Sequence, residues 1–453
     1  MEWNQLLSSK RLGEKSEKSP TNNRSPFESD IDRIIFSGSF RRLSRKTQVH
    51  PLAPNDHVHT RLTHSLEVAQ VGKALGKKLG IEIKDKLPKN FSPDDMANIV
   101  QAACLAHDLG NPPFGHAGES AITHWFEVNS QQLFRSLDKH IKKDLSVFEG
   151  NAQGFRILTQ TENHLFDGGL RLTYACLGTF LKYPWSSRIS KDKFGAYITE
   201  ENILTSVAKE LGLIKKGEHE WCRHPLAYLV EAADDICYAV LDLEDAVELG
   251  ILKFDQVSSL LLEMFDVNEQ NIIKKNFGPE NAFRVNLARI RSPVFDKVAS
   301  EAILSFMSNY DKIMAGSFNS ELFQEDGNGA IILKAKKMAR KNIFKDQKKV
   351  EIELGCYSTF ECLLKSFCEA ALDCSLNLKG PQEEVKLAWK SNLVLNLLAD
   401  HAPNEKNSPP GNGWSKYQCL RRVLDYVSGM TDNYAIYIAK QLQGMGFSGV
   451  QRP

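Results

Sequence analysis

Two histidines and two aspartates in this sequence are of the types that bind a divalent cation. His64 stands alone, His107 and Asp108 are adjacent, and Asp234 follows far downstream. Two carboxylates roughly neutralise a divalent ion and leave coordination positions open for water and a phosphate oxygen. Such an ion polarises a phosphoryl group and lowers the pKa of a bound water. The mixed nitrogen and oxygen set suits Mn²⁺, Fe²⁺, Co²⁺ or Mg²⁺ better than a closed tetrahedral zinc site.

The residues around these four support a phosphate-handling centre. His107 and Asp108 end an apolar stretch, IVQAACLAHDLG, and glycine and proline follow at once, which predicts a ring and a carboxylate at an exposed helix end. Arg61 precedes His64 by three residues. That spacing places both on one helical face, where a guanidinium is suited to bind a phosphate.

Asp234 begins a second run of functional side chains, because Tyr238 and Asp242 follow it at i+4 and i+8 on the same helical face. The periodicity does not choose between Asp234 and the adjacent Asp235, and either carboxylate could instead pair with a neighbouring cation. An isolated His-Asp pair is more often a solvated helix end than a metal site. The prediction therefore rests on the joint pattern.

The elements that position these residues are predicted to be helices. The pattern of apolar residues favours helices that start near Leu62 and near Ala97, and strands are scarce, the best candidate being a short piece at 47–49. The fold class is therefore all-α. Further helices are expected at 225–247, 254–264, 281–309, 350–375, 383–399, 416–428 and 431–443.

We expect a flexible lead-in over residues 1–26, a metallohydrolase core over 27–250 and a C-terminal helical region over 251–453 that completes the active site and makes oligomer contacts. Residues 8–26 are polar and rich in proline, serine and lysine. Loops or a boundary are expected at the glycine-, asparagine- and proline-rich segments 325–329 and 402–413.

Composition narrows the function further. Lys+Arg (57) and Asp+Glu (56) nearly cancel, so no global field recruits nucleic acid or an anionic membrane. No apolar run approaches the roughly 20 residues of a spanning helix, and the start lacks the apolar segment of a signal peptide, so we expect a cytoplasmic protein. Cysteines recur every six residues from Cys356 to Cys374, but six helical steps turn by about 240° and scatter them. They are interpreted as reduced, mostly buried small side chains.

The pattern H…HD…D resembles the HD-domain phosphohydrolases, and within them the deoxyguanosinetriphosphate triphosphohydrolases and their broader dNTPase-like relatives. The segments NPPFGHAGE and FEGNAQGFR, in this order and spacing, are the most specific part of the likeness. The likeness covers most of residues 28–246 and a short C-terminal piece. It is carried by DRIIFSGSFRRLSRKTQV (32–49), TRLTHSLEVAQVG (60–72), AHDLGNPPFGHAGE (106–119), FEGNAQGFRIL (148–158), GLRLTYACLG (169–178), KYP (182–184), EAADDICYAVLDLEDA (231–246) and SGMTDNYA (428–435).

The resemblance implies a reaction and its machinery. Enzymes of this family cleave a deoxynucleoside triphosphate, dGTP in many members, between the sugar 5′-oxygen and the α-phosphorus, releasing deoxynucleoside and inorganic triphosphate. The metal ligands implied are His64, His107, Asp108 and Asp234, which selects Asp234 over Asp235. His116 and Glu119 are implied as the catalytic pair, and their spacing of three lets Glu119 orient His116 while that ring handles a proton.

The same resemblance implies substrate contacts. Lys182, Tyr183 and Arg61 are the expected phosphate binders, because charge-assisted contacts suit a triphosphate. Gln48 resembles a glutamine that contacts the sugar near its 3′-hydroxyl, with Asp242 as a second partner. Tyr238 would stack beneath the sugar and exclude a 2′-hydroxyl. The remaining residues of the FEGNAQGFR segment, namely Asn151, Gln153 and Arg156, are assigned only to the active-site wall.

The implied cofactor is Mn²⁺ or Mg²⁺, with Co²⁺, Fe²⁺ or Ni²⁺ as alternatives. Family members commonly form hexamers or tetramers, so a homo-oligomer is expected, and activation by a second nucleotide or by single-stranded DNA stays open, as does base preference. Two other functions remain: an HD phosphohydrolase acting on another nucleotide, or a non-catalytic sensor of nucleotides or single-stranded nucleic acid. Near-zero net charge and the intact candidate ligands argue against the sensor.

Overall fold

The computed structural model describes residues 1–14, 24–49, 55, 57–135, 137–163, 167–189, 191–279, 282–325, 329–343, 347–377, 387–398 and 415–446. The loop expected at 402–413, and parts of the segments 8–26 and 325–329, lie outside these residues. Within the described segments, no helix combines the length and the hydropathy needed to cross a membrane.

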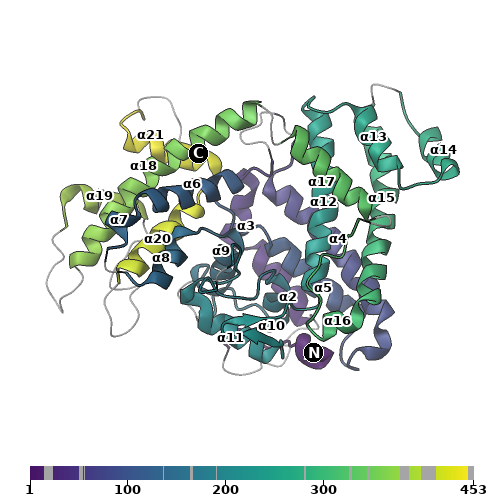
Figure 1. Cartoon of the computed structure of the whole chain (residues 1–453), viewed down its shortest axis with the longest axis horizontal. Helices are drawn as coiled ribbons and strands as arrows, with labels where there is room; N and C mark the ends of the chain where they lie inside the picture. The colour runs from purple at the N-terminus through teal and green to yellow at the C-terminus, as the bar shows by residue number, and fades with distance from the viewer. Residues whose placement is uncertain are drawn as a thin grey trace.

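The fold is all-α, as predicted, and Figure 1 shows helices throughout the described chain. Where described, the chain forms one small sheet of two antiparallel strands, β1 and β2. The elements are α1 (Trp3–Leu6), α2 (Pro26–Ile35), α3 (Gly38–Arg42), α4 (Arg61–Glu82), α5 (Pro93–Ala106), α6 (His116–Val128), α7 (Ser130–Leu133), α8 (Lys139–Ser146), α9 (Gly150–Arg156), α10 (Tyr174–Phe180), α11 (Glu201–Glu210), β1 (Lys215–Gly217), β2 (Glu220–Trp221), α12 (Ala227–Glu248), α13 (Phe254–Leu262), α14 (Val267–Lys275), α15 (Phe283–Ser308), α16 (Tyr310–Met314), α17 (Ala330–Asn342), α18 (Gln347–Asn377), α19 (Trp389–Leu398), α20 (Lys416–Ser428) and α21 (Asp432–Leu442).

The longer predicted helices are confirmed, since α12, α13, α15, α18, α20 and α21 begin and end within a few residues of their predicted bounds. The candidate strand at 47–49 contributes a single bridge, from Thr47 to Thr60. Helix α17 was not predicted, although its buried Ile331, Ile332, Ala335 and Ala339 follow helical spacing. The cysteines are all free, and all but Cys362 are buried, which confirms their interpretation.

Helices α4 and α5 pack unusually closely and set the position of the metal-type residues. Gly72, Gly76 and Gly80 form a stripe on α4 that faces α5. A Cβ added at Gly72 would lie 2.4 Å from the sulfur of Cys104, and one added at Gly76 would lie 2.9 Å from the carbonyl oxygen of Met96. Only glycine allows this approach. It brings the first turn of α4 against the end of α5.

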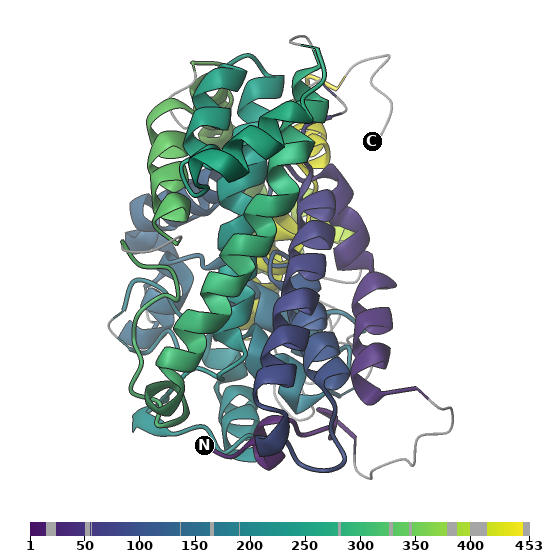
Figure 2. The ribbon, with the colours of Figure 1, turned by 90° about the vertical axis from the view of Figure 1, so that its right-hand side faces the viewer.

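Side chains pack into two large hydrophobic clusters, and neither begins or ends at residue 250. One joins α2, α4, α5 and α10 to α12, α13, α15 and α17, and Figure 2 shows the long helices α4 and α15 side by side. The other joins α6 to α18, α20 and α21, which gather at the opposite end of Figure 1. The C-terminal helices therefore pack directly on the segment that begins with His116.

Candidate active site

Three of the four predicted metal ligands converge at the junction of α4, α5 and α12. Nε2 of His64 lies 3.0 Å from Oδ1 of Asp234, and Nε2 of His107 lies 3.6 Å from the same oxygen. One candidate ligand atom from each residue lies within 4.8 Å of the others. Nδ1 of His107 donates to the carbonyl oxygen of Cys104 at 2.7 Å, which turns Nε2 toward the cluster. This donor set fits a divalent ion.

Asp108 lies at the edge of this cluster. Its Oδ1 is 3.6 Å from Nε2 of His107, and its Oδ2 accepts a hydrogen bond from Arg61 at 2.7 Å. The side-chain amide of Asn111 donates to Oδ1. The prediction of an exposed helix end is wrong, because Asp108 is only 8% exposed. Arg61 and Asn111 cover the carboxylate and orient it.

The charges of the cluster support one another. Burial opposes the ionised form of Asp234, but the neighbouring rings of His107 and His64 hold the pKa of that carboxyl well below its usual range. Burial likewise disfavours a charged His107, but Asp108 and Asp234 outweigh it and raise the pKa of the ring to about 9. The two carboxylates therefore stabilise a positive charge beside them, which His107 carries here and which a divalent ion would supply instead.

Asp235 points elsewhere, so the geometry separates the two adjacent aspartates. Its Oδ1 lies 2.5 Å from Nζ of Lys336 on α17. Burial raises the pKa of Asp235 to about 7, with Lys336 acting in the opposite direction. Asp234, and not Asp235, contacts the two histidines.

A cleft of about 400 Å³ opens above the cluster. That volume is within the range of small-molecule sites. His64 is buried behind Asp234, which it contacts, and Asp242 is buried about two turns beyond Asp234 on α12, so neither lines the cleft. Ten of the twelve predicted site residues do line it: Gln48, Arg61, His107, Asp108, His116, Glu119, Lys182, Tyr183, Asp234 and Tyr238.

His116 and Glu119 form a hydrogen-bonded pair on the first turn of α6. Nδ1 of His116 lies 2.8 Å from Oε2 of Glu119, and Oε1 of Glu119 accepts from the backbone N–H of Gly150 at 2.8 Å. Burial disfavours the carboxylate, but the contact with His116 prevails and lowers the pKa of Glu119. The His116 side chain is 83% exposed, whereas Glu119 is buried. A fixed carboxylate thus orients a ring that is free to meet a ligand.

Two of the three expected phosphate binders, Lys182 and Arg61, contact carboxylates in this structure. Lys182 lies 3.0 Å from Glu231, and that contact, working against burial, raises the pKa of the lysine. Arg61 contacts Asp108 with one nitrogen, while its Nε has no hydrogen-bond partner among the described residues. A Cβ on Gly115 would lie 2.4 Å from Nη2 of Arg61 and would displace the guanidinium, and the φ of 57° at this position also favours glycine.

Three further cations line the cleft and were missed from the sequence. Lys193 lies 3.0 Å from Glu149 and 3.9 Å from Glu119. Lys336 and Arg340 come from α17, one helical turn apart. The basic run KAKKMARKN, taken at helical spacing, was the available signal for these two.

Of the three residues expected to contact the sugar, two line the cleft and the third, Asp242, is buried outside it. Gln48 and Tyr238 line the cleft, and the buried Oε1 of Gln48 has no hydrogen-bond partner in the part of the chain that the structure describes. It is therefore available to a hydroxyl donor. Burial raises the pKa of Asp242 well above its usual range, with Asp245 and Asp234 acting in the same direction. A protonated Asp242 is itself a donor.

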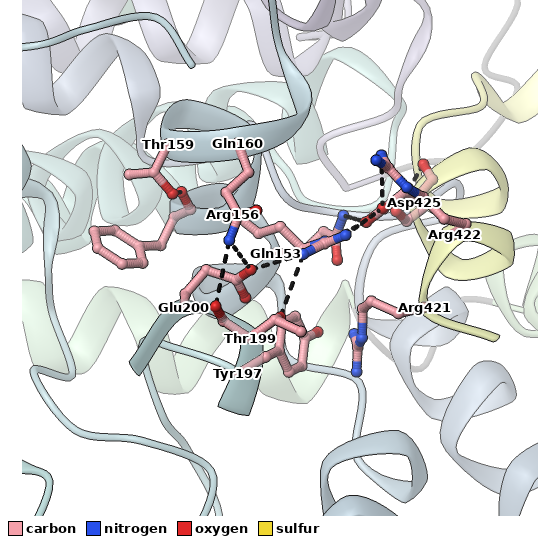
Figure 3. Close-up of polar contacts among 12 residues, drawn as sticks. Gln153, Arg156, Thr159, Gln160, Tyr197, Thr199, Glu200, Arg421, Arg422 and Asp425 are labelled. Atoms are coloured by element: carbon pink, nitrogen blue, oxygen red, sulfur yellow. Dashed lines mark hydrogen bonds and ion pairs between the residues drawn. The ribbon is translucent and has the colours of Figure 1, made fainter. Parts of the chain in front are cut away.

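The residues of the FEGNAQGFR segment have two different roles: some line the cleft, and others hold α9 against neighbouring elements. Asn151 lines the cleft, whereas Arg156 does not, and Figure 3 shows the polar contacts that Arg156 makes with Asp425 and Glu200. Arg156 donates to both carboxylate oxygens of Asp425 on α20, at 2.7 and 2.8 Å, and to Glu200 at 2.7 Å. Gln153 also donates to Asp425, at 3.0 Å. The buried pairs join α9 to α20.

The sequence of this chain is similar to a known domain family and to several known proteins. A model of the HD domain matches residues 61–239, which contain all four predicted ligands. A deoxyguanosinetriphosphate triphosphohydrolase-like protein of Pseudomonas aeruginosa is 43% identical, over 98% of this chain and 99% of its own length. One from Synechocystis is 37% identical over 98% of this chain and 100% of its own. The deoxyguanosinetriphosphate triphosphohydrolase of Klebsiella pneumoniae is 33% identical over 90% and 92%.

Proposed function

This chain belongs to the family of HD-domain hydrolases named deoxyguanosinetriphosphate triphosphohydrolase-like proteins, and we propose that it hydrolyses deoxynucleoside triphosphates, dGTP among them, to deoxynucleoside and inorganic triphosphate. The observation that carries the proposal is the meeting of two kinds of group in one cleft. His107 and Asp234 of the metal-type cluster lie at the floor, with His64 buried behind them, and the His116–Glu119 pair lies on the wall.

His64, His107, Asp108 and Asp234 would hold the ion, which we propose to be Mn²⁺ or Mg²⁺. When bound, such an ion supplies Lewis-acid polarisation of a phosphoryl oxygen. The cations of the walls bind the rest of a triphosphate and fix the α-phosphorus for in-line attack, which is a proximity effect. Arg61 and Lys182 fill this role, together with Lys193, Lys336 and Arg340, and the neutral hydroxyl of Tyr183 is a further donor to the phosphates.

His116 handles the proton in this proposal. Glu119 accepts from Nδ1 and so leaves Nε2 of the ring to exchange a proton with the attacking water or the leaving 5′-oxygen. The carboxylate of Glu119 stays ionised and stabilises the ring when it becomes positively charged. Gln48 accepts a hydrogen bond from the sugar 3′-hydroxyl, and the buried Asp242 is the second polar partner near that hydroxyl. The ring of Tyr238 packs beside C2′ and leaves no room for a 2′-hydroxyl.

The test is incubation of the purified protein with each dNTP and rNTP in Mn²⁺ or Mg²⁺, followed by chromatographic separation of the products. Deoxynucleoside plus intact triphosphate, with ribonucleotides left unchanged, is the expected result. Orthophosphate or pyrophosphate would instead indicate an HD phosphohydrolase of another kind. Salt-dependent binding of single-stranded DNA without turnover of any nucleotide would indicate a sensor.

The proposal also includes a cytoplasmic homo-oligomer, tetrameric or hexameric, in which residues 251–453 supply part of the interfaces. Light scattering at several protein concentrations tests the assembly. Adding each dNTP, or a single-stranded oligonucleotide, to the dGTP assay tests whether a second ligand activates the enzyme.

A further inference from the structure

The turn between α20 and α21, which we name the C-terminal corner (residues 428–432), contacts two active-site segments. Oδ2 of Asp432 accepts from the backbone N–H of Thr47 at 3.0 Å and from its hydroxyl at 2.6 Å. Oδ1 of Asp432 accepts from the backbone N–H of Phe114 at 3.0 Å. Thr47 immediately precedes Gln48, and Phe114 stands two residues before His116. One carboxylate thus joins the two segments.

The Phe114 contact matters because the backbone there is strained. Phe114 has φ of 62°, in the left-handed region that bulky side chains rarely adopt, and Gly115 follows with φ of 57°. A conformation of this kind persists only where its surroundings hold it. The ring of Phe114 packs edge-on against Phe360 of α18, and Asp432 holds its N–H. The turn therefore sets the direction of the chain where α6 begins at His116.

A second contact crosses the same boundary. Nζ of Lys46 is buried and donates to the carbonyl oxygens of Asn111 and of Ser428, the latter at 2.7 Å. The C-terminal corner is therefore joined to the segment before Gln48 and to the segment between Asp108 and His116. Asp432 itself is 2% exposed, so water does not replace its partners.

We propose that Asp432 is a positioning residue of the active site: it holds the strained turn that aims His116 and the segment that presents Gln48 in fixed relation to each other. This inference rests on the proposed function for its catalytic consequence. Its structural part, the fixing of two backbone N–H groups, stands independently. Among the described residues, Asp432 is the carboxylate that accepts hydrogen bonds from Thr47 and Phe114.

The test compares Asp432→Asn with the matched control Tyr417→Phe. The asparagine keeps the shape but presents one N–H group where the carboxylate accepted, so one of the two backbone contacts is lost. Tyr417 lies at the other end of α20 and donates to the buried Asp144. Its substitution removes a buried hydrogen bond of the same C-terminal region without touching the active-site segments.

Two readouts separate positioning from general loss of stability. Hydrogen exchange followed by mass spectrometry should show the peptide containing Thr47, or the one containing Phe114, exchanging at least about tenfold faster in Asp432→Asn and unchanged in Tyr417→Phe. With dGTP, kcat should fall at least about tenfold in Asp432→Asn at unchanged manganese content, and stay near wild type in the control.

Equal exchange at both peptides in the two variants overturns the proposal, and so does an equal fall of kcat in both. If the wild-type protein hydrolyses no nucleotide, the proposed function fails instead. The exchange experiment still decides whether Asp432 fixes the two segments, because it needs no substrate.

Discussion

The substitution Glu119→Gln isolates the tie between the two members of the proposed catalytic pair. If the glutamine oxygen keeps the hydrogen bond from the N–H of Gly150, its amide nitrogen faces Nδ1 of His116 and donates to it. The ring then carries its proton on Nε2 and cannot accept one there. Both the charge and the tautomer of the pair are altered, while the volume of the side chain is not.

The size of the effect follows from two ranges. A hydrogen bond to a charged group contributes about 1.5–3 kcal/mol, or about 10–150-fold in rate at 1.36 kcal/mol per tenfold. A positioned acid or base contributes about 10²–10⁴-fold. The ranges meet near 100-fold, so we expect kcat for dGTP to fall about 100-fold while the bound metal is retained.

The assay is steady-state turnover of dGTP, with metal content measured on the same samples. His116→Ala and the double variant His116→Ala/Glu119→Gln serve as controls. If Glu119 acts through His116, the double variant is no slower than His116→Ala alone. A Glu119→Gln protein that keeps kcat within about threefold of wild type, or full additivity of the two substitutions, refutes the reasoning.

Three further predictions concern stability and selectivity. Arg156→Met removes the buried guanidinium that pairs with both Glu200 and Asp425, leaves Asp425 among the described residues only the longer ion pair with Arg422, and should lower the free energy of unfolding by about 3–5 kcal/mol in denaturant titrations; a loss under about 1 kcal/mol would contradict this. Burial opposes a charged His59, but its carboxylate neighbours raise its pKa from 6.5 to about 10, so its contribution to stability is full below pH 6.5 and is lost as the pH rises through 10. Urea midpoints between pH 6.5 and 10 should therefore fall less steeply for His59→Gln than for wild type, and identical slopes would show the assignment to be wrong. Tyr238→Ala should raise the rate with GTP relative to dGTP at least about tenfold, and an unchanged ratio would remove the ring from the account of sugar selectivity.

The helices and the residue types of the site could be predicted because both are local properties. Asp234, Tyr238 and Asp242 share a helical face by spacing alone, and α12 carries them as expected. Spacing places Asp235 next to the same face equally well. Only the packing of α12 on α4 and α17 directs Asp234 to the histidines and Asp235 to Lys336.

What could not be predicted depends on contacts between distant segments. The burial of Asp108 arises from Arg61, 47 residues earlier in the chain. The left-handed turn at Phe114 gives no pattern in sequence, because phenylalanine does not favour it and its partner Asp432 is 318 residues away. Tertiary packing, and not local preference, supplied these features.

The most direct test of the central claim is the location of the metal. A crystal of the protein grown with Mn²⁺ and measured at the manganese absorption edge gives an anomalous map of the ion. The account predicts one peak bonded to His64, His107, Asp108 and Asp234, with His64 and Asp234 no longer in direct contact. A manganese peak elsewhere in the molecule, with those two side chains still hydrogen-bonded to each other, would contradict it.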